Sequence, residues 1–127
     1  AEPVVAYLHY TLVKLGVQSV VLSGMPHSMA DKARMLQTDD VLLAISFSPY
    51  TANTRELVDI CLLNKAKVVA LTDSTLSPIA RADDFHLEVL EDEVSGFRGL
   101  SATMCLALCL AVETGRVRAE LDKKLNT

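Results

Sequence analysis

Four hydroxyl side chains lie within nine residues of each other, directly after the apolar run Val41–Ile45: they are Ser46, Ser48, Thr51 and Thr54. Hydroxyls donate hydrogen bonds to phosphate oxygens. Where a helix follows, its free N–H groups and its dipole also favour an anion. Serine and threonine are, however, also common as helix caps and turn residues. One cap needs one hydroxyl, so four of them favour an anion-binding loop, while the capping interpretation stays open.

The surrounding sequence predicts the elements that must position this loop. Short apolar or β-branched runs alternate with segments whose apolar residues recur at helical spacing. Pro3 suits the first turn of a helix and Gly16 its end. The expected strands are 17–22, 41–45, 67–72 and 85–90; the expected helices are 3–15, 26–36, 53–64, 77–82 and 97 or 98 to 112, before a charged tail at 116–126 that is helical or frayed.

This alternation predicts the fold class. Continuous apolar strands are typical of a parallel sheet that is buried on both faces, and alternating helices supply the cover. We therefore expect an α/β protein, a three-layer sandwich with helices on both faces of a parallel sheet. Ligands of such sheets bind at the carboxyl ends of the strands, which is where the loop 46–53 lies.

The composition limits the function classes. The chain of 127 residues has a net charge of −4 and is 50% hydrophobic, which suits one globular domain spanning 1–127. Its only basic pair is Lys123-Lys124, so this chain alone is a poor nucleic-acid binder. The longest apolar stretch, 100–112, is too short to span a membrane. Because the N-terminus, Ala1-Glu2-Pro3, is acidic and lacks the basic region of a signal peptide, we expect a cytoplasmic protein.

The three cysteines predict neither a metal site nor a disulfide framework. Cys61, Cys105 and Cys109 form no CxxC pair, and no histidine lies near them in the sequence. We interpret them as apolar thiols of a reduced compartment rather than as metal ligands. The sequence therefore predicts no metal and no cofactor.

Three motifs together resemble a known family. They are the loop Ser46-Phe47-Ser48-Pro49-Tyr50-Thr51, the segment ALTDSTLSPIARADD at 70–84, and FRGLSAT at 97–103. The chain resembles a SIS (sugar isomerase) domain, and more closely the phosphosugar-sensing domain of RpiR-type transcriptional regulators. The resemblance implies a parallel sheet of flavodoxin-like order and a sugar phosphate held by Ser46, Ser48 and Thr51. Phe47 and Tyr50 lie inside the same loop, where the bulky Tyr50 can wall the sugar pocket.

The chain departs from the family pattern at two places. Pro49 stands where SIS domains usually have glycine, so one backbone N–H is absent from the loop. The family's first strand, with its Gly-rich loop, should precede the first helix, yet the sequence given starts at Ala1. We therefore expect a fragment whose first strand is missing.

Further candidates lie outside the loop. His27 follows the expected strand 17–22 and could contact a sugar hydroxyl, although a surface histidine is the plainer interpretation. Arg98 is expected to open the last helix and could reach a ligand or a partner subunit; a solvated arginine is the alternative. That helix is apolar nearly all round, which predicts burial against the core on one side and against a partner on the other. SIS domains pair this way, so we expect a homo-oligomer, a dimer or a tetramer.

Three functions follow as hypotheses. The first is a binding module that senses a sugar phosphate and controls an absent N-terminal helix-turn-helix domain, through which alone the protein meets DNA. The second is an enzyme, a phosphosugar isomerase or lyase, with the same phosphate anchor and a carboxylate or histidine base. The third is a dimerisation domain that has lost its ligand.

Overall fold

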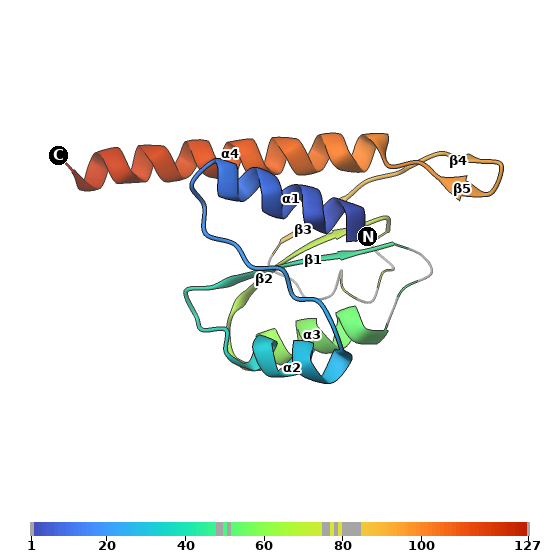
Figure 1. Cartoon of the computed structure of the whole chain (residues 1–127), viewed down its shortest axis with the longest axis horizontal. Helices are drawn as coiled ribbons and strands as arrows, with labels where there is room; N and C mark the ends of the chain where they lie inside the picture. The colour runs from blue at the N-terminus through green and yellow to red at the C-terminus, as the bar shows by residue number, and fades with distance from the viewer. Residues whose placement is uncertain are drawn as a thin grey trace. The chain divides into compact units, whose positions relative to one another are not determined.

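The computed structural model describes residues 2–47, 50, 52–74, 77, 79 and 85–126. These residues form two compact units: Leu22–Leu90, and Glu2–Val21 together with Glu91–Thr127. Figure 1 shows the elements in chain order: α1 (Glu2–Lys14), α2 (Pro26–Arg34), β1 (Val41–Ser46), α3 (Ala52–Leu63), β2 (Lys67–Thr72), β3 (Phe85–Glu88), β4 (Glu93–Val94), β5 (Phe97–Arg98) and α4 (Ser101–Leu125).

A parallel sheet of order β1-β2-β3 is the centre of the first unit. Its register pairs Val41 with Lys67 at one end of β1 and Ser46 with Thr72 at the other. The central strand β2 is the most deeply buried of the three, from Val68 to Thr72, because it has a neighbouring strand on each side. The parallel sheet expected from the continuous apolar runs is confirmed.

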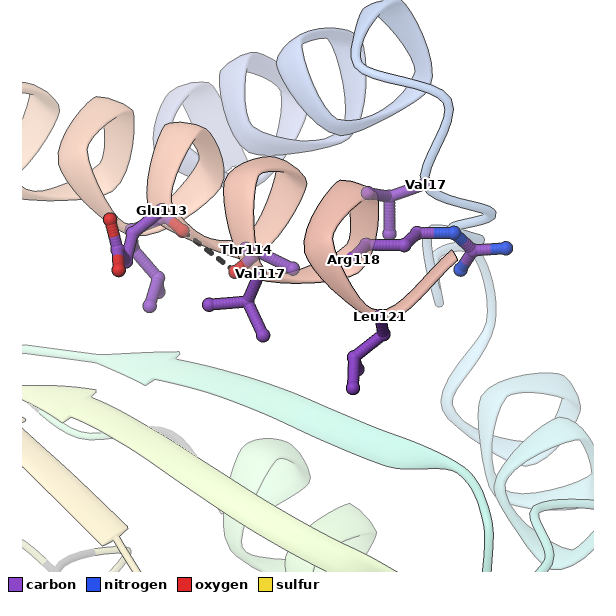
Figure 2. A pocket seen from close by; sticks show the side chains of 7 residues that line it. Val17, Glu113, Thr114, Val117, Arg118 and Leu121 are labelled. Carbon is purple, nitrogen blue, oxygen red and sulfur yellow. Dashed lines mark hydrogen bonds between the residues drawn. The ribbon is translucent and has the colours of Figure 1, made fainter. Parts of the chain in front are cut away.

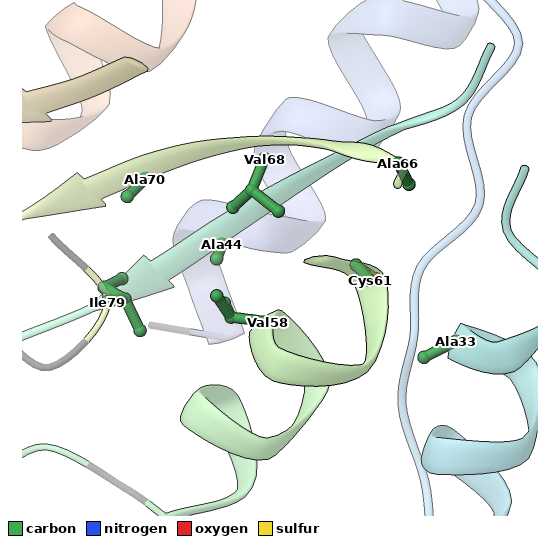
Figure 3. Close-up of a cluster of buried hydrophobic side chains, with 8 residues drawn as sticks. All are labelled: Ala33, Ala44, Val58, Cys61, Ala66, Val68, Ala70 and Ile79. Carbon is green, nitrogen blue, oxygen red and sulfur yellow. The ribbon is translucent and has the colours of Figure 1, made fainter. Parts of the chain in front are cut away.

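Two helices cover one face of this sheet, and α3 lies directly against β1 and β2 (Figure 1). Small residues on the strands, Ala44 and Ala70, leave room for Val58 and Cys61 of α3 (Figure 3). The Asn64 amide donates a hydrogen bond of 3.0 Å to the Arg34 carbonyl, which ties the end of α3 to the end of α2. This packing fixes where α3 begins relative to the end of β1.

The second unit is built on the packing of α1 against α4. Val4 and Leu8 of α1 are buried, as are the small residues Ala107 and Ala111 of α4. At Gly115 an added Cβ would come to 3.2 Å from the Leu15 side chain, which is tighter than usual, so Leu15 would have to shift by a few tenths of an ångström. Small residues on α4 therefore let the two helices approach closely.

A β-hairpin precedes α4, at the place where the sequence predicted the start of the last helix. β4 and β5 pair antiparallel, with Glu93 opposite Arg98 and Val94 opposite Phe97. Ser95 and Gly96 both have positive φ, as a two-residue hairpin turn of type I′ requires. The prediction that the last helix starts at residue 97 or 98 is therefore wrong: α4 begins at Ser101, and Arg98 lies on a strand.

The same helix corrects the prediction for the tail. α4 runs unbroken to Leu125, so the expected helix 98–112 and the charged segment 116–126 are one element. Within the tail, Arg116 bridges Glu113 and Glu120, three and four residues away on the same helical face. Such ion pairs stabilise a solvated helix that has few apolar residues. The hydrophobic pattern alone therefore placed the end of this helix too early.

The strand expected at 17–22 is not formed. Neither of the two sheets in the described part of the chain includes this segment. A strand exists through hydrogen bonds to a neighbour, so a β-branched sequence without a paired neighbour stays irregular. The helix end before it is confirmed, since Gly16 has φ 78° and Val17 N–H bonds back to the Leu12 carbonyl at 2.9 Å. Most of the helix expected at 77–82 lies outside the described residues.

The N-terminus of α4 is capped by a carboxylate from the chain before the hairpin. Glu91 accepts hydrogen bonds from Thr103 N–H at 2.9 Å and from Ala102 N–H at 3.1 Å. The Thr103 N–H, with further help from Ala102 and the Arg98 charge, lowers the pKa of Glu91 below its usual value. The Glu91 carboxylate thus already occupies the position at the N-terminus of α4 where an external anion could bind.

Replacing this carboxylate should make stability depend less on pH. Because the folded pKa of Glu91 lies below its unfolded value, about 4.3, the ionised cap stabilises the fold above that pH. The stabilisation is lost as the pH falls through the folded pKa. We expect Glu91→Gln to unfold at a lower temperature than the unsubstituted protein at pH 7, and the gap to close toward pH 3.

Asp92→Asn is the matched control, because it removes the same charge one residue away and leaves both N–H bonds intact. A gap that stays constant from pH 7 to pH 3, or an equal gap for the control, would contradict the assignment of Glu91 as the cap.

Candidate functional site

Two buried hydroxyls mark the carboxyl edge of the parallel sheet. Ser46 is the last residue of β1 and is only 6% exposed, and Thr72 is the last residue of β2 and fully buried. The register pairs them across the two strands. Ligands of parallel sheets bind at this edge, so the structure brings the first predicted phosphate ligand, Ser46, to the expected place.

The structure describes half of the predicted binding loop. Ser46 is buried, while Phe47 and Tyr50 are half-buried. The other two predicted phosphate ligands, Ser48 and Thr51, and Pro49 lie outside the described residues. Of the three predicted phosphate ligands, Ser46 alone lies within the described residues.

Tyr50 connects the loop after β1 to the turn after β2. Its phenol donates a hydrogen bond of 2.6 Å to Asp73 Oδ1. The Thr72 hydroxyl lies 3.5 Å from the same carboxylate oxygen, which makes a much weaker contact. The carboxyl ends of two adjacent strands are thus linked by side chains, and Asp73 faces the loop.

The helix that follows the loop has the features of an anion-accepting end. α3 begins at Ala52, and its first turn carries no acidic residue. By contrast, the first N–H groups of α4 bond to the Glu91 carboxylate. The two helix starts therefore differ chemically: the dipole at the α4 start acts on a carboxylate of its own chain, whereas the sequence puts none in the first turn of α3.

The two outlying candidates lie on other elements. His27 is in the first turn of α2, with a side chain that is 93% exposed and an Nε2 atom 3.8 Å from Asp31 Oδ2. Arg98 is half-buried on β5, in the second unit, opposite Glu93. No hydrogen bond or ion pair links His27 to Ser46, Phe47 or Tyr50 within the described part of the chain.

An open, largely apolar pocket of about 430 Å³ lies along the second half of α4 (Figure 2). Its lining contains none of the predicted site residues: it consists of Val17, Leu110, Glu113, Thr114, Val117, Arg118 and Leu121. Residues 2–47, 52–74 and 85–126 bring together no group of three metal-ligating side chains. Among the described helices, none is both long and apolar enough to cross a bilayer.

A family model identifies the fold and its class. Residues 3–113 match the SIS domain, so the chain belongs to the SIS domain family. This confirms the resemblance inferred from the three sequence motifs.

The curated relatives are regulators. An uncharacterized HTH-type transcriptional regulator of Haemophilus influenzae is 38% identical over 76 residues, 60% of this chain and 26% of the relative. The HTH-type transcriptional regulator RpiR of Escherichia coli K12 is 29% identical over 85 residues, 67% of this chain and 28% of RpiR. The chain thus spans about a quarter of the length of these relatives.

Solved structures share the fold. The sugar isomerase domain of the RpiR transcription factor from Sphaerobacter thermophilus superposes with a TM-score of 0.82 at 23% identity, over 91% of this chain and 64% of that one. The Vibrio vulnificus NanR protein complexed with ManNAc-6P gives a TM-score of 0.72 at 22% identity, over 95% of this chain and 46% of NanR. These likenesses confirm the α/β fold class predicted from the sequence.

Two features of this edge were underrated from the sequence. Thr72 was treated as an ordinary strand residue, although its pairing with Ser46 makes a second buried hydroxyl at the edge. Asp73 directly follows the expected strand 67–72, and the structure shows it bonded to Tyr50. Their position in the sequence was the signal that could have identified them. Thr72 ends the buried strand β2 and Asp73 follows it, and the neighbouring strand β1 leads into the loop.

Proposed function

We propose that this chain is the phosphosugar-binding effector domain of an RpiR-type transcriptional regulator that acts in the cytoplasm. The observation that carries the proposal is Ser46, a buried hydroxyl at the carboxyl end of β1 in a SIS-family chain. Support comes from the relatives named as HTH-type regulators and from NanR, whose structure holds ManNAc-6P.

The phosphate end of the ligand is assigned to the loop and to α3. Ser46, Ser48 and Thr51 supply hydroxyl donors, and the dipole of α3 adds to them because its N-terminus follows the loop. Phe47 and Tyr50 shape the pocket beside them. A sugar phosphate suits these groups better than a metal cation, because hydroxyl and N–H groups donate hydrogen bonds to an anion. It also suits them better than a nucleic acid, because Lys123-Lys124 is the only pair of adjacent basic residues in the sequence.

Regulation then follows from differential binding. DNA contact belongs to a helix-turn-helix domain outside this chain, in keeping with the relatives' names. The sugar phosphate binds one arrangement of the oligomer better than another, and its binding energy shifts the population toward that arrangement. The chain is one SIS domain of the longer regulator, since the family match at 3–113 takes in parts of both units.

The family's first strand remains part of this proposal. Within the described residues β1 has a neighbouring strand on one side only. A parallel strand from another part of the full regulator would pair with its other edge, as the flavodoxin-like order of the family implies.

The central test is thermal unfolding against a panel of sugar phosphates that includes ManNAc-6P. A ligand at one hundred times its Kd stabilises the folded state by about 2.7 kcal/mol, which raises Tm by several degrees in a domain of this size. We expect such a shift with at least one sugar phosphate. The shift should vanish in a Ser46→Ala/Ser48→Ala variant and persist in Thr38→Ala, which removes an exposed hydroxyl outside the loop.

Each outcome decides between functions. A shift with unchanged sugar phosphate after incubation supports a sensor over the isomerase or lyase alternative. No shift with any sugar phosphate, in a protein that unfolds cooperatively, would leave the hydroxyls as helix caps and overturn the proposal.

His27 and Arg98 are proposed to contact the sugar end of the ligand. If so, His27→Ala and Arg98→Ala lose one hydrogen bond each, roughly three- to tenfold in Kd for a sugar phosphate. Their affinity for inorganic phosphate should be unchanged, whereas Ser46→Ala should weaken both ligands. Calorimetric titration measures the two affinities, and an equal loss for both ligands would move these residues to the phosphate end.

We further propose that the protein is a homodimer through one face of α4. Cys105, Leu108, Cys109 and Val112 are all exposed, and their spacing puts them on a single stripe. The segment Met104–Val112 contains no charged residue, so two copies can meet without like-charge repulsion. The opposite face, with Ala107 and Ala111, is buried in the chain's own packing. A two-fold dimer would bury the stripe on both copies.

Cysteine crosslinking tests this arrangement. If two α4 helices pair antiparallel about the centre of the stripe, the two Cys109 residues lie about 1.5 Å apart along the helix axis and the two Cys105 residues about 10 Å apart. Mild oxidation should therefore crosslink Cys105→Ser but not Cys109→Ser. Cys61 serves as the internal control, because it is buried and its burial raises its pKa. Sedimentation as a monomer, or equal crosslinking of both variants, would refute this interface.

A further inference from the structure

The hydrogen bond between Tyr50 and Asp73 joins two loops at the candidate site. The phenol oxygen and Asp73 Oδ1 are 2.6 Å apart, in the range of a hydroxyl bound to an ionised carboxylate. Both side chains are half-buried, so water competes for this bond less than it would at the open surface. The partners are separated by 23 residues in the chain, so the bond is a tertiary contact rather than a local turn.

The two partners differ in how firmly the fold holds them. Asp73 directly follows β2, the central strand, whose last residue Thr72 is fully buried. The Thr72 carbonyl also accepts a hydrogen bond of 2.9 Å from Val89 N–H, beyond the end of β3. Tyr50, in contrast, lies between two elements, in the loop that connects β1 to α3. The carboxylate is therefore the fixed point, and the loop is what it restrains.

We propose that Tyr50 and Asp73 form a clamp that positions the binding loop, so that Tyr50 is a positioning residue rather than a ligand contact through its hydroxyl. The inference rests on the proposed function and deepens it. Tyr50 immediately precedes Thr51 and follows Ser48 by two residues, so restraining Tyr50 limits the space open to both hydroxyl-bearing neighbours. A loop that is already restrained loses less conformational entropy when it binds phosphate.

The clamp also accounts for a carboxylate beside an anion site. An aspartate near a bound phosphate weakens binding through like-charge repulsion unless something offsets it. Asp73 Oδ1 accepts the hydrogen bond of the Tyr50 phenol, so in this proposal the carboxylate serves the loop as an acceptor rather than contacting the ligand. The site then requires a hydrogen-bond acceptor oxygen at Asp73 more than it requires the negative charge of this residue.

Three substitutions separate these contributions. Tyr50→Phe removes the donor and keeps the ring, so any wall that the ring provides is preserved. Asp73→Ala removes the acceptor. Asp73→Asn keeps a side-chain oxygen that can accept the phenol hydrogen but removes the charge. Tyr10→Phe is the matched control, since Tyr10 is exposed on α1 and its loss of a hydroxyl touches neither loop.

The measurement is the Kd for ManNAc-6P and other hexose 6-phosphates by calorimetric titration, together with the Tm of each unliganded variant. We expect Tyr50→Phe and Asp73→Ala to bind about five- to tenfold more weakly, and the double variant to be no weaker than either alone, because all three lack the same bond. Asp73→Asn should stay within about twofold of the unsubstituted protein, as should Tyr10→Phe.

A merely structural role would lower the unliganded Tm without this pattern in Kd. The clamp is overturned if Tyr50→Phe binds normally, if the two losses multiply in the double variant, or if Asp73→Asn binds as weakly as Asp73→Ala. If the clamp alone is wrong, the unsubstituted protein still binds a sugar phosphate tightly, and Ser46→Ala still abolishes that binding. If the unsubstituted protein binds none of these sugar phosphates, the proposed function and the clamp fall together.

Discussion

The hydrogen-bonded pairing of β2 with strands on both sides is the constraint on which the candidate site depends. A central parallel strand is covered on both faces, and the stretch Val68–Leu71 of β2 is accordingly apolar. Its register then places Thr72 beside Ser46 at the end of β1. A one-residue slip would turn every side chain of β1 to the other face. The strand pairing thus decides which hydroxyl reaches the edge of the sheet and where Asp73 emerges to meet the loop.

The helix ends of this chain show two solutions to the same electrostatic problem. Every helix start presents N–H groups without intrahelical partners, and these favour negative charge. α4 solves this with Glu91, which bonds two of its N–H groups. α3 follows a loop of hydroxyls and has no acidic residue in its first turn. An external anion can compete for the second kind of helix end, whereas at the first it would have to displace a covalently attached carboxylate.

The sequence predicted those parts of the fold that depend on burial. The expected strands 41–45 and 67–72 match β1 and β2 closely, because a strand buried on both faces leaves a continuous apolar run. Parts that depend on a partner or on turn chemistry were missed. The segment 17–22 has β-branched residues, but it pairs with none of the described strands. The Ser95-Gly96 turn that makes the hairpin is a local signal within an acidic stretch. At the site, Ser46 followed from the end of an apolar run, whereas the Tyr50–Asp73 bond required the strand order.

The proposed sensor also needs a connection from its ligand site to the rest of the protein, and the chain provides a short one, made of one backbone hydrogen bond and a few consecutive residues. Val89 N–H bonds to the Thr72 carbonyl next to Asp73, and Glu91 caps α4. Leu90 alone separates these two residues, at the boundary between the two units. The end of β2 is therefore connected, through Val89 and Leu90, to the residue that holds the start of α4. Because the exposed stripe of α4 begins only a turn further on, at Cys105, the proposed ligand site and the proposed dimer face lie on elements that the chain joins through a few bonds, which is the kind of connection that coupling of two binding equilibria would use.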